Sequence, residues 1–262
     1  MNRRLTRSVV IAAGLAGIVS AVAANRGTVT VAAQGEGSKS PKNRRNFVTC
    51  PIVRDTAVLP CWLAEYEGEL YYLGTQGSSG SAFYPPQLNH EVLVEGTIAA
   101  GPRICGGIPL SPIRVSVMTE LNRACNTVLP AEAAFTAPPS PLMPMPKYPD
   151  TTREFTVPYE FNSDYLTLHA TRFVAEAARI ATLVKAASID VYGRRGATLL
   201  SNGRVLTEGP QIAAIRAKTM GEHLVGLGLP ADRVHVTWQT AADTPDGLTD
   251  PERRRLTITL KP

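Results

Sequence analysis

The sequence predicts an α+β protein with two folded regions of different character. Between residues 47 and 130, short apolar runs with alternate spacing are separated by glycine turns, which predicts β-strands. Between residues 153 and 262, strand-like runs alternate with stretches whose apolar residues recur at helical spacing. The segment 131–152 is dense in proline, which blocks helix and sheet pairing. We therefore expect two domains joined by an extended linker.

The first 46 residues predict a secretion signal followed by a tail. Three arginines precede an apolar run, and Ala21-Val22-Ala23 is a small-residue pattern typical of a cleavage site. Residues 1–23 are thus predicted to be a signal peptide, with an uncleaved anchor as the alternative. Residues 24–46 are basic and rich in glycine, serine and lysine, which predicts a disordered tail.

The net charge of +5 belongs to these N-terminal segments. Residues 1–23 hold three arginines and no acid, and residues 24–46 hold five basic residues and one acid, which leaves −2 for residues 47–262. A nucleic-acid-binding domain requires a basic patch on its folded part. The charge distribution therefore argues against a nucleic-acid partner.

The β-rich region 47–130 contains all four cysteines. An even number of cysteines behind a secretion signal predicts two disulfides. Three pairings are possible, and short local loops favour Cys50 with Cys61 and Cys105 with Cys125. Zinc is the competing interpretation, but there is no CxxC pair and no histidine at ligand spacing. We expect no metal.

Strands in this region are predicted within 62–74, on both sides of Glu67-Gly68, and at 90–99 and 112–118. Short strands with glycine turns favour a small barrel or sandwich, such as an OB-like fold. Aromatic side chains here are candidates for a face that stacks on glycan or peptide, with core packing as the alternative. They are Trp62, Tyr66, Tyr71, Tyr72, Phe83 and Tyr84.

Region 153–262 predicts the order strand, helix, strand, helix, strand, strand. Ser163 or Asp164 is predicted to cap a helix that runs through Lys185, and Thr207 is predicted to cap a second helix that Gly228 ends. Between them, residues 199–206 predict a hairpin with an Asn-Gly turn. Helices that cover one face of a sheet leave the strand ends and their loops for binding.

Arginines gather near one strand end of this region. A strand at 188–192 stops at Gly193, Arg194 and Arg195 follow, and Arg216 lies in the second predicted helix. Guanidinium groups and helix N-terminal N–H groups both favour anions. Because a strand alternates its faces, one arginine of the run 253–255 is expected to join Arg216, and Arg254 is our candidate. This edge is a candidate carboxylate-binding site.

Residues 155–262 resemble the OmpA-like C-terminal domain, the peptidoglycan-binding module of bacterial envelope proteins. The residues that carry the resemblance are an opening strand at 159–164, the strand 189–193, Ile215-Arg216-Ala217 with Leu224, Gly228, Leu229 and Pro230, and the closing strand 253–258. The resemblance implies a non-enzymatic periplasmic protein, associated with the outer membrane or cell wall and without a cofactor. Its implied partner is the peptidoglycan stem peptide, with Arg216 binding a carboxylate and Arg194 or Arg195 reinforcing it.

One position departs from the family pattern. The family follows its second strand with Gly-x-Thr-Asp, whose aspartate binds the ammonium of diaminopimelate, and this sequence has Gly196 there. Glu208, Asp243 and Asp246 are the candidates to replace that acid. The alternative function is an envelope scaffold that has lost wall binding and contacts other envelope proteins. No paired carboxylates or Cys/His pair in the sequence support an enzyme.

Overall fold

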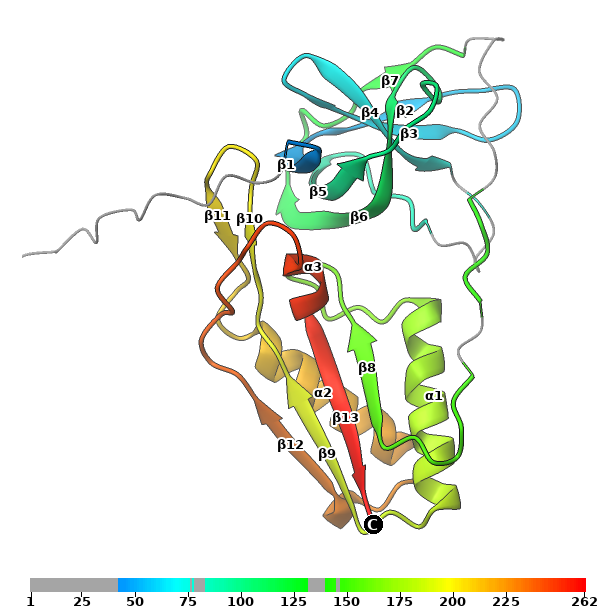
Figure 1. Ribbon diagram of the computed structural model, residues 1–262, viewed down its shortest axis with the longest axis vertical. Coiled ribbons are helices and arrows are strands. Elements are labelled where there is room, and N and C mark those ends of the chain that lie inside the picture. The colour runs from blue at the N-terminus through cyan, green and yellow to red at the C-terminus, as the bar shows by residue number, and fades with distance from the viewer. Residues whose placement is uncertain (1–41, 76, 78–82, 132–139, 145–146) are drawn as a thin grey trace, which may run out of the picture. The chain divides into compact units, whose positions relative to one another are not determined.

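The computed structural model describes residues 42–75, 77, 83–131, 140–144 and 147–262 (Figure 1). All of them belong to one compact unit, Gly37–Pro262. The predicted signal peptide and the predicted tail up to residue 41 lie outside the described residues. Strand β1 begins at Arg44, so the last three residues of that tail segment are part of a strand.

The β-rich region forms one seven-stranded sheet with the order β1-β5-β6-β4-β3-β2-β7. The expected small barrel or sandwich of OB-like form is not confirmed, because the order of the described strands runs from β1 at one edge to β7 at the other. The strands are β1 Arg44–Thr49, β2 Pro51–Arg54, β3 Cys61–Tyr66, β4 Glu69–Thr75, β5 His90–Ile98, β6 Ile108–Leu121 and β7 Val128–Leu129.

The β3–β4 hairpin turns where the sequence predicted it. Glu67 and Gly68 both have positive φ, 53° and 78°, which a tight turn of this kind requires. Alternate residues of the strands then face a shared core, in which Phe47, Val92 and Val94 are buried. The aromatic side chains of the hairpin mostly contribute to this core, as the alternative interpretation expected.

The disulfides join Cys50 to Cys125 and Cys61 to Cys105, so the pairing favoured from the sequence is wrong. Strand pairing explains the first bond. β2 and β7 are parallel with Val53 opposite Val128, and three residues before these positions stand Cys50 and Cys125. Local loop length had favoured the other pairing, but the register of two strands far apart in the chain decides which sulfur atoms meet.

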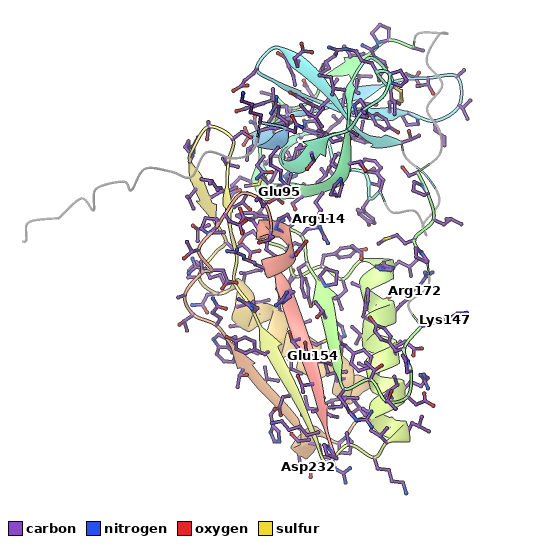
Figure 2. All side chains as sticks on the ribbon, in the orientation of Figure 1. Glu95, Arg114, Lys147, Glu154, Arg172 and Asp232 are labelled. Atoms are coloured by element: carbon purple, nitrogen blue, oxygen red, sulfur yellow. A yellow bond between two sulfur atoms is a disulfide. The ribbon has the colours of Figure 1, made fainter. Side chains whose placement is uncertain are left out.

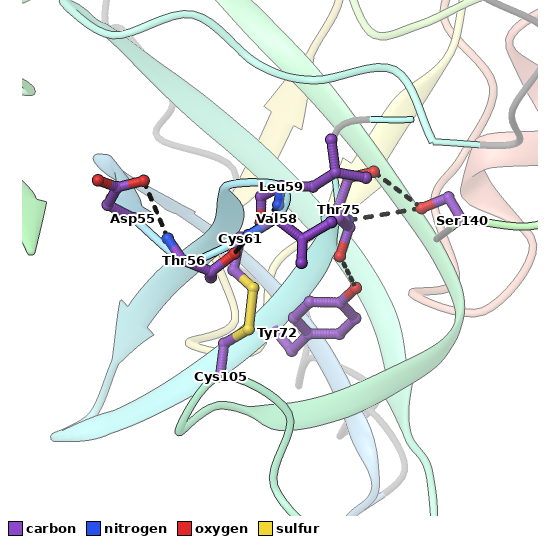
Figure 3. Close-up of a disulfide and its surroundings, with 9 residues drawn as sticks. All are labelled: Asp55, Thr56, Val58, Leu59, Cys61, Tyr72, Thr75, Cys105 and Ser140. Carbon is purple, nitrogen blue, oxygen red and sulfur yellow. Dashed lines mark hydrogen bonds between the residues drawn. A yellow bond between two sulfur atoms is a disulfide. The ribbon is translucent and has the colours of Figure 1, made fainter. Parts of the chain in front are cut away.

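The second disulfide lies beside the β3–β4 hairpin (Figure 3). Cys61 opens β3, and Cys105 belongs to the bend before β6; both are buried with Leu63. Near them, the hydroxyl of Tyr72 bonds that of Thr75, and Ser140 Oγ donates to the Thr75 carbonyl at 3.0 Å. Ser140 belongs to the segment predicted as a linker, so part of that segment is held against the sheet.

The C-terminal region confirms the predicted order strand, helix, strand, helix, strand, strand. Its four-stranded sheet has the order β12-β9-β13-β8, with β12 and β9 parallel and the other pairs antiparallel. The main elements are β8 Glu154–Pro158, α1 Leu168–Leu183, β9 Ser188–Gly193, α2 Ile212–Gly226, β12 Val234–Trp238 and β13 Arg255–Lys261.

Three smaller elements are inserted into this order. The hairpin of β10 Ala197–Leu199 and β11 Val205–Thr207 confirms the hairpin prediction, with Gly203 at φ 82° in its turn. A 3-10 turn, η1 Ala231–Arg233, precedes β12, and a short helix, α3 Asp250–Arg253, precedes β13. The hairpin, α3 and the loop after β8 all lie at the same end of the four-stranded sheet (Figure 1).

Helices α1 and α2 cover one face of the four-stranded sheet (Figure 1). Alternate strand residues such as Ile189, Val191 and Ile258 are fully buried against them. Small residues on the helices, such as Ala177 and Ala217, allow close packing on the sheet. Tyr148, from the predicted linker, also packs against this core, with its ring centroid 4.9 Å from that of Phe155.

Several predicted boundaries of this region are wrong. The opening strand is Glu154–Pro158 rather than 159–164, and the N-cap of α1 is Thr167, whose Oγ1 accepts from Ala170 N at 3.1 Å. α2 starts after Gln211, while Thr207 ends β11. None of the described helices is long and apolar enough to span a membrane.

Candidate functional site

Arg216 lies on the buried side of α2 and forms an ion pair with Glu208. Neither side chain has any exposed surface. Arg216 Nη2 donates to Glu208 Oε1 at 2.6 Å, and Nη1 donates to Oε2 at 3.1 Å, which is the two-point geometry that arginine and carboxylate favour. The acid that partners this arginine is therefore Glu208, one of the three candidates considered from the sequence.

The other N–H groups of Arg216 are bound by backbone carbonyls. Nε donates to Ser163 at 2.7 Å, Nη2 also donates to Glu160 at 2.8 Å, and Nη1 also donates to Arg194 at 3.4 Å. A guanidinium has five N–H donors, and these contacts engage all five. Arg216 therefore holds together the loop after β8, the end of β9 and the segment before α2.

Glu208 is equally well satisfied. Besides Arg216, its carboxylate accepts from Gly196 N at 2.6 Å and from Asn162 N at 2.8 Å. A buried carboxylate needs such partners, because burial without them would cost several kcal/mol. The pair thus forms a closed polar centre inside the domain.

Gly196 lies directly against this centre. A Cβ atom at this position would come within 2.7 Å of Arg254 Cγ and 3.4 Å of Glu208 Oε2. The first distance is closer than side chains pack, so a larger residue would have to displace Arg254. The place where the resemblance implies an aspartate is filled by other parts of this chain.

Arg254 binds a residue of the seven-stranded sheet and does not share the acid that Arg216 binds. It forms an ion pair with Glu95 of β5, and both side chains are fully buried. Nη1 of Arg254 also donates to Thr198 Oγ1 at 2.8 Å, and that hydroxyl donates to Glu95 Oε1 at 2.9 Å. This triad joins β5 to the β10–β11 hairpin and the start of β13.

Arg194 and Arg195 hold the loop that follows β12. Arg194 Nη2 bonds Asp243 Oδ1 at 2.8 Å, while Arg195 donates to the carbonyls of Glu208 at 2.8 Å and Thr240 at 3.2 Å. Burial raises the pKa of Asp243, but hydrogen bonds from Arg194 and Gln239 outweigh it and leave that pKa below its ordinary value. Both arginines therefore have partners within the chain.

Asp246 belongs to the same loop and pairs with Arg253. It also accepts hydrogen bonds from the backbone N–H groups of Leu248 and Thr249, both at 2.7 Å. Burial raises the pKa of Asp246, but the bonds from Thr249 and Leu248 lower it more, so the net shift is downward. Asp243 and Asp246 thus shape this loop.

Glu160 and Arg114 add a second pair of charges near the Glu95–Arg254 pair. Arg114 stands directly opposite Glu95 in the β5–β6 ladder (Figure 2). Burial raises the pKa of Glu160 to about 7, and the positive charges of Arg114 and Arg254 oppose that rise only in part. The carboxyl of Glu160 can therefore change its charge near neutral pH.

A surface pocket opens beside the N-terminal end of α2. It has a volume of about 300 Å³ and is lined by Asn162, Asp164, Gly209, Pro210, Gln211, Ile212 and Ile215. The buried pair fixes its two walls, because Glu208 binds Asn162 N on one side and Arg216 extends from α2 on the other. In addition, Gly209 N donates to Asn162 Oδ1 at 2.8 Å, which joins the walls directly.

The structure therefore brings Arg216, Glu208 and Gly196 into one buried cluster and places Arg194, Arg195 and Arg254 around it. Sequence reasoning missed the pocket and the role of Glu95. The signal for Glu95 was an acid that directly follows the apolar run Val92-Leu93-Val94 in the strand at 90–98. No cluster of His, Cys, Asp and Glu in the part of the chain that the structure describes could hold a metal ion.

No family model and no curated protein matches this chain. Solved structures that are similar to it include the OmpA-like domain of FopA1 from Francisella tularensis subsp. tularensis SCHU S4, at 15% identity and TM-score 0.32, covering 41% of this chain and 73% of that chain. Another is a MotB-like protein from Desulfovibrio vulgaris, at 16% identity and TM-score 0.33, covering 41% and 75%.

A third is the periplasmic domain of Helicobacter pylori MotB, at 18% identity and TM-score 0.30, covering 41% of this chain and 74% of that chain. Each of these three matches covers 41% of this chain.

Proposed function

We propose that this protein is a non-enzymatic protein of the bacterial cell envelope that associates with peptidoglycan through the pocket beside α2. The observation that carries the proposal is that a fully paired, buried Arg216–Glu208 centre fixes both walls of an open pocket. A preorganised pocket binds at lower entropic cost than one that must form around its ligand. The OmpA-like resemblance of the sequence supports peptidoglycan as the partner and the periplasm as the location.

In this proposal, Arg216 positions the pocket and does not bind the ligand itself. A ligand carboxylate would have to displace Glu208, and breaking a buried ion pair costs about 3–5 kcal/mol. The exposed carboxylate of Asp164 is instead the group that meets the ammonium of a stem peptide. Ile212 and Ile215 line the same pocket and provide apolar surface for the aliphatic part of that residue. Arg195 supports the wall at Gly209 through its bond to the carbonyl of Glu208, whereas Arg194 and Arg254 bind residues outside the pocket.

Sedimentation of the purified protein with isolated peptidoglycan sacculi tests the proposal. We expect the wild type to sediment with the sacculi and Asp164→Asn to bind about tenfold more weakly, because a charge-assisted hydrogen bond is lost. Asp232→Asn removes an exposed acid in η1, outside the pocket, and should bind like the wild type. Absence of wild-type binding would reject the proposal.

A second candidate function is an envelope scaffold that contacts other proteins. The observation that favours it is that all five N–H donors of Arg216 are engaged within the chain. If the protein is a scaffold, we expect the wild type to remain in the supernatant when sacculi are sedimented. Its circular dichroism spectrum should still show an intact fold. Cross-linking in intact cells would then be the way to find the protein partner.

A further inference from the structure

One aromatic side chain of the seven-stranded domain stands apart from the others. Trp62 and Tyr71 are buried in the core, and Tyr66, Tyr72 and Phe83 are partly buried. Tyr84, in contrast, has 53% of its surface exposed. The predicted aromatic face on this domain therefore reduces to a single exposed ring.

The aromatic partner of Tyr84 is Tyr165, which belongs to the C-terminal region. The ring centroid of Tyr84 lies 6.0 Å from that of Tyr165, in the loop between β8 and α1, with the two rings tilted by 48°. The two hydroxyls are 3.3 Å apart, and Tyr165 is itself 56% exposed. The hydrogen bond to Tyr165, with a smaller effect of burial, raises the pKa of Tyr84, so this phenol stays neutral at physiological pH.

The loop that carries Tyr165 also forms part of the pocket beside α2. Tyr165 directly follows Asp164, which lines the pocket, and Tyr165 N donates to Ser163 Oγ at 3.1 Å, which fixes the turn between them. Gln211, across the pocket, is exposed and makes no capping bond to α2. An exposed carboxylate and an exposed carboxamide thus line one pocket, and the exposed ring pair begins at the residue that follows the carboxylate in the chain.

We propose that Tyr84 and Tyr165 form an aromatic platform for a glycan strand, with Asp164 and Gln211 binding its hydroxyl and amide groups. The C–H face of a sugar ring is apolar and stacks on the electron-rich face of an aromatic ring. Its rim carries hydroxyls that a carboxylate and a carboxamide can bind. The choice of peptidoglycan as the source of the glycan rests on the proposed function; the site itself rests on these four residues.

Isothermal titration of the purified protein with a peptide-free tetramer of N-acetylglucosamine tests the platform. We expect the wild type to bind and Tyr84→Ala or Tyr165→Ala to weaken binding about fivefold. Tyr84→Phe keeps the ring and should retain most of the affinity. Tyr192→Ala, which removes a tyrosine 40% exposed on β9, is the matched control and should bind like the wild type.

Equal affinity of the wild type and both alanine variants would overturn the platform, as would a wild type that does not bind the tetramer. The sacculus assay keeps this failure separate from that of the proposed function. If the protein sediments with sacculi but does not bind the tetramer, the glycan platform is wrong and peptidoglycan association stands. If it binds the tetramer but not sacculi, the platform stands and peptidoglycan is not its source of glycan.

Discussion

The guanidinium of Arg216 is held entirely by its own chain, although arginine is a residue that often binds ligands. Its partner Glu208 is just as buried, and both have their hydrogen bonds satisfied. A satisfied buried pair contributes little over an apolar pair of the same shape, but removing one member leaves an uncompensated charge. The effect of a substitution here depends on which charge remains.

Glu208→Gln should destabilise the protein by about 3 kcal/mol, because Arg216 would keep its charge in a buried site without a counter-charge. Urea unfolding followed by circular dichroism measures this. Glu176→Gln is the control, since Glu176 pairs with Arg179 on the surface and exposed pairs contribute at most about 1 kcal/mol. Equal losses in the two variants would contradict the buried-pair account.

Gly196→Ala should cost about 1–3 kcal/mol, because the new Cβ would contact Arg254 Cγ at 2.7 Å. Gly226→Ala is the matched control: Gly226 ends α2, and a Cβ added there would meet no atom within 4 Å. Alanine there should be neutral or stabilising by up to about 1 kcal/mol. The difference between the two midpoints of urea unfolding is the test, and a neutral Gly196→Ala would refute the steric argument.

Sequence reasoning identified the residues of this centre but not their roles. Arg194 and Arg216 were singled out from strand-end and helix-start signals, and Gly196 from the departure from the family pattern; the three do lie together. The partner of Arg254, in contrast, comes from a segment whose approach no local pattern encodes, since Glu95 lies 159 residues before Arg254. A pattern shows that an arginine is present, whereas its burial is set by tertiary packing.

At the scale of elements, the order of strands and helices after residue 153 followed from hydrophobic periodicity alone. The helix starts did not, because Ser163, Asp164 and Thr167 are all acceptable caps before α1, and α2 starts after Gln211, which makes no side-chain capping bond. α1 is capped by Thr167 and not by Ser163 or Asp164. In α2, Ile215 is apolar and yet 43% exposed, whereas Met220 and Leu224 are fully buried.

Thr167→Ala should destabilise the protein by about 1 kcal/mol through loss of the bond from Ala170 N to Oγ1. Asp164→Ala, at a position that the sequence also predicted as a cap, should change the stability by less than about 0.5 kcal/mol. Thermal unfolding of the two variants side by side distinguishes them. A larger loss of stability in Asp164→Ala than in Thr167→Ala would show that Thr167 is not the N-cap of α1.

At the scale of the whole described unit, buried charges connect the two sheets. Glu95 belongs to β5 of the first sheet and its partner Arg254 to the C-terminal region, and neither side chain has any exposed surface. The strand order within each sheet could be anticipated only in part, and the pairing between sheets not at all, because it depends on contacts far apart in sequence. The disulfide pairing failed for the same reason.

The stability of the protein should fall as pH rises from about 4.5 to about 7. Burial raises the pKa of Glu160 from its ordinary 4.5 to about 7, so the folded protein binds this proton more tightly than the unfolded chain does. The stabilisation is complete below pH 4.5 and is lost as pH rises through 7, up to about 3 kcal/mol. Urea unfolding at pH 5 and pH 8 measures it.

Glu160→Gln provides the comparison, because it removes this titration and keeps the size of the side chain. The variant should show a smaller loss of stability than the wild type between the two pH values. Identical pH profiles would mean that Glu160 is not the responsible group. Other titrating groups contribute equally to both profiles and therefore cancel in the difference.

The two disulfides also determine how the chain behaves when it is cut. The loop closed by Cys61 and Cys105 lies inside the loop closed by Cys50 and Cys125, so the cross-links are nested. A protease that cleaves one peptide bond between residues 62 and 104 would yield two fragments that stay attached through both bridges. Electrophoresis without a reducing agent would show such a nicked protein at its full mass, and only reduction would reveal the cut.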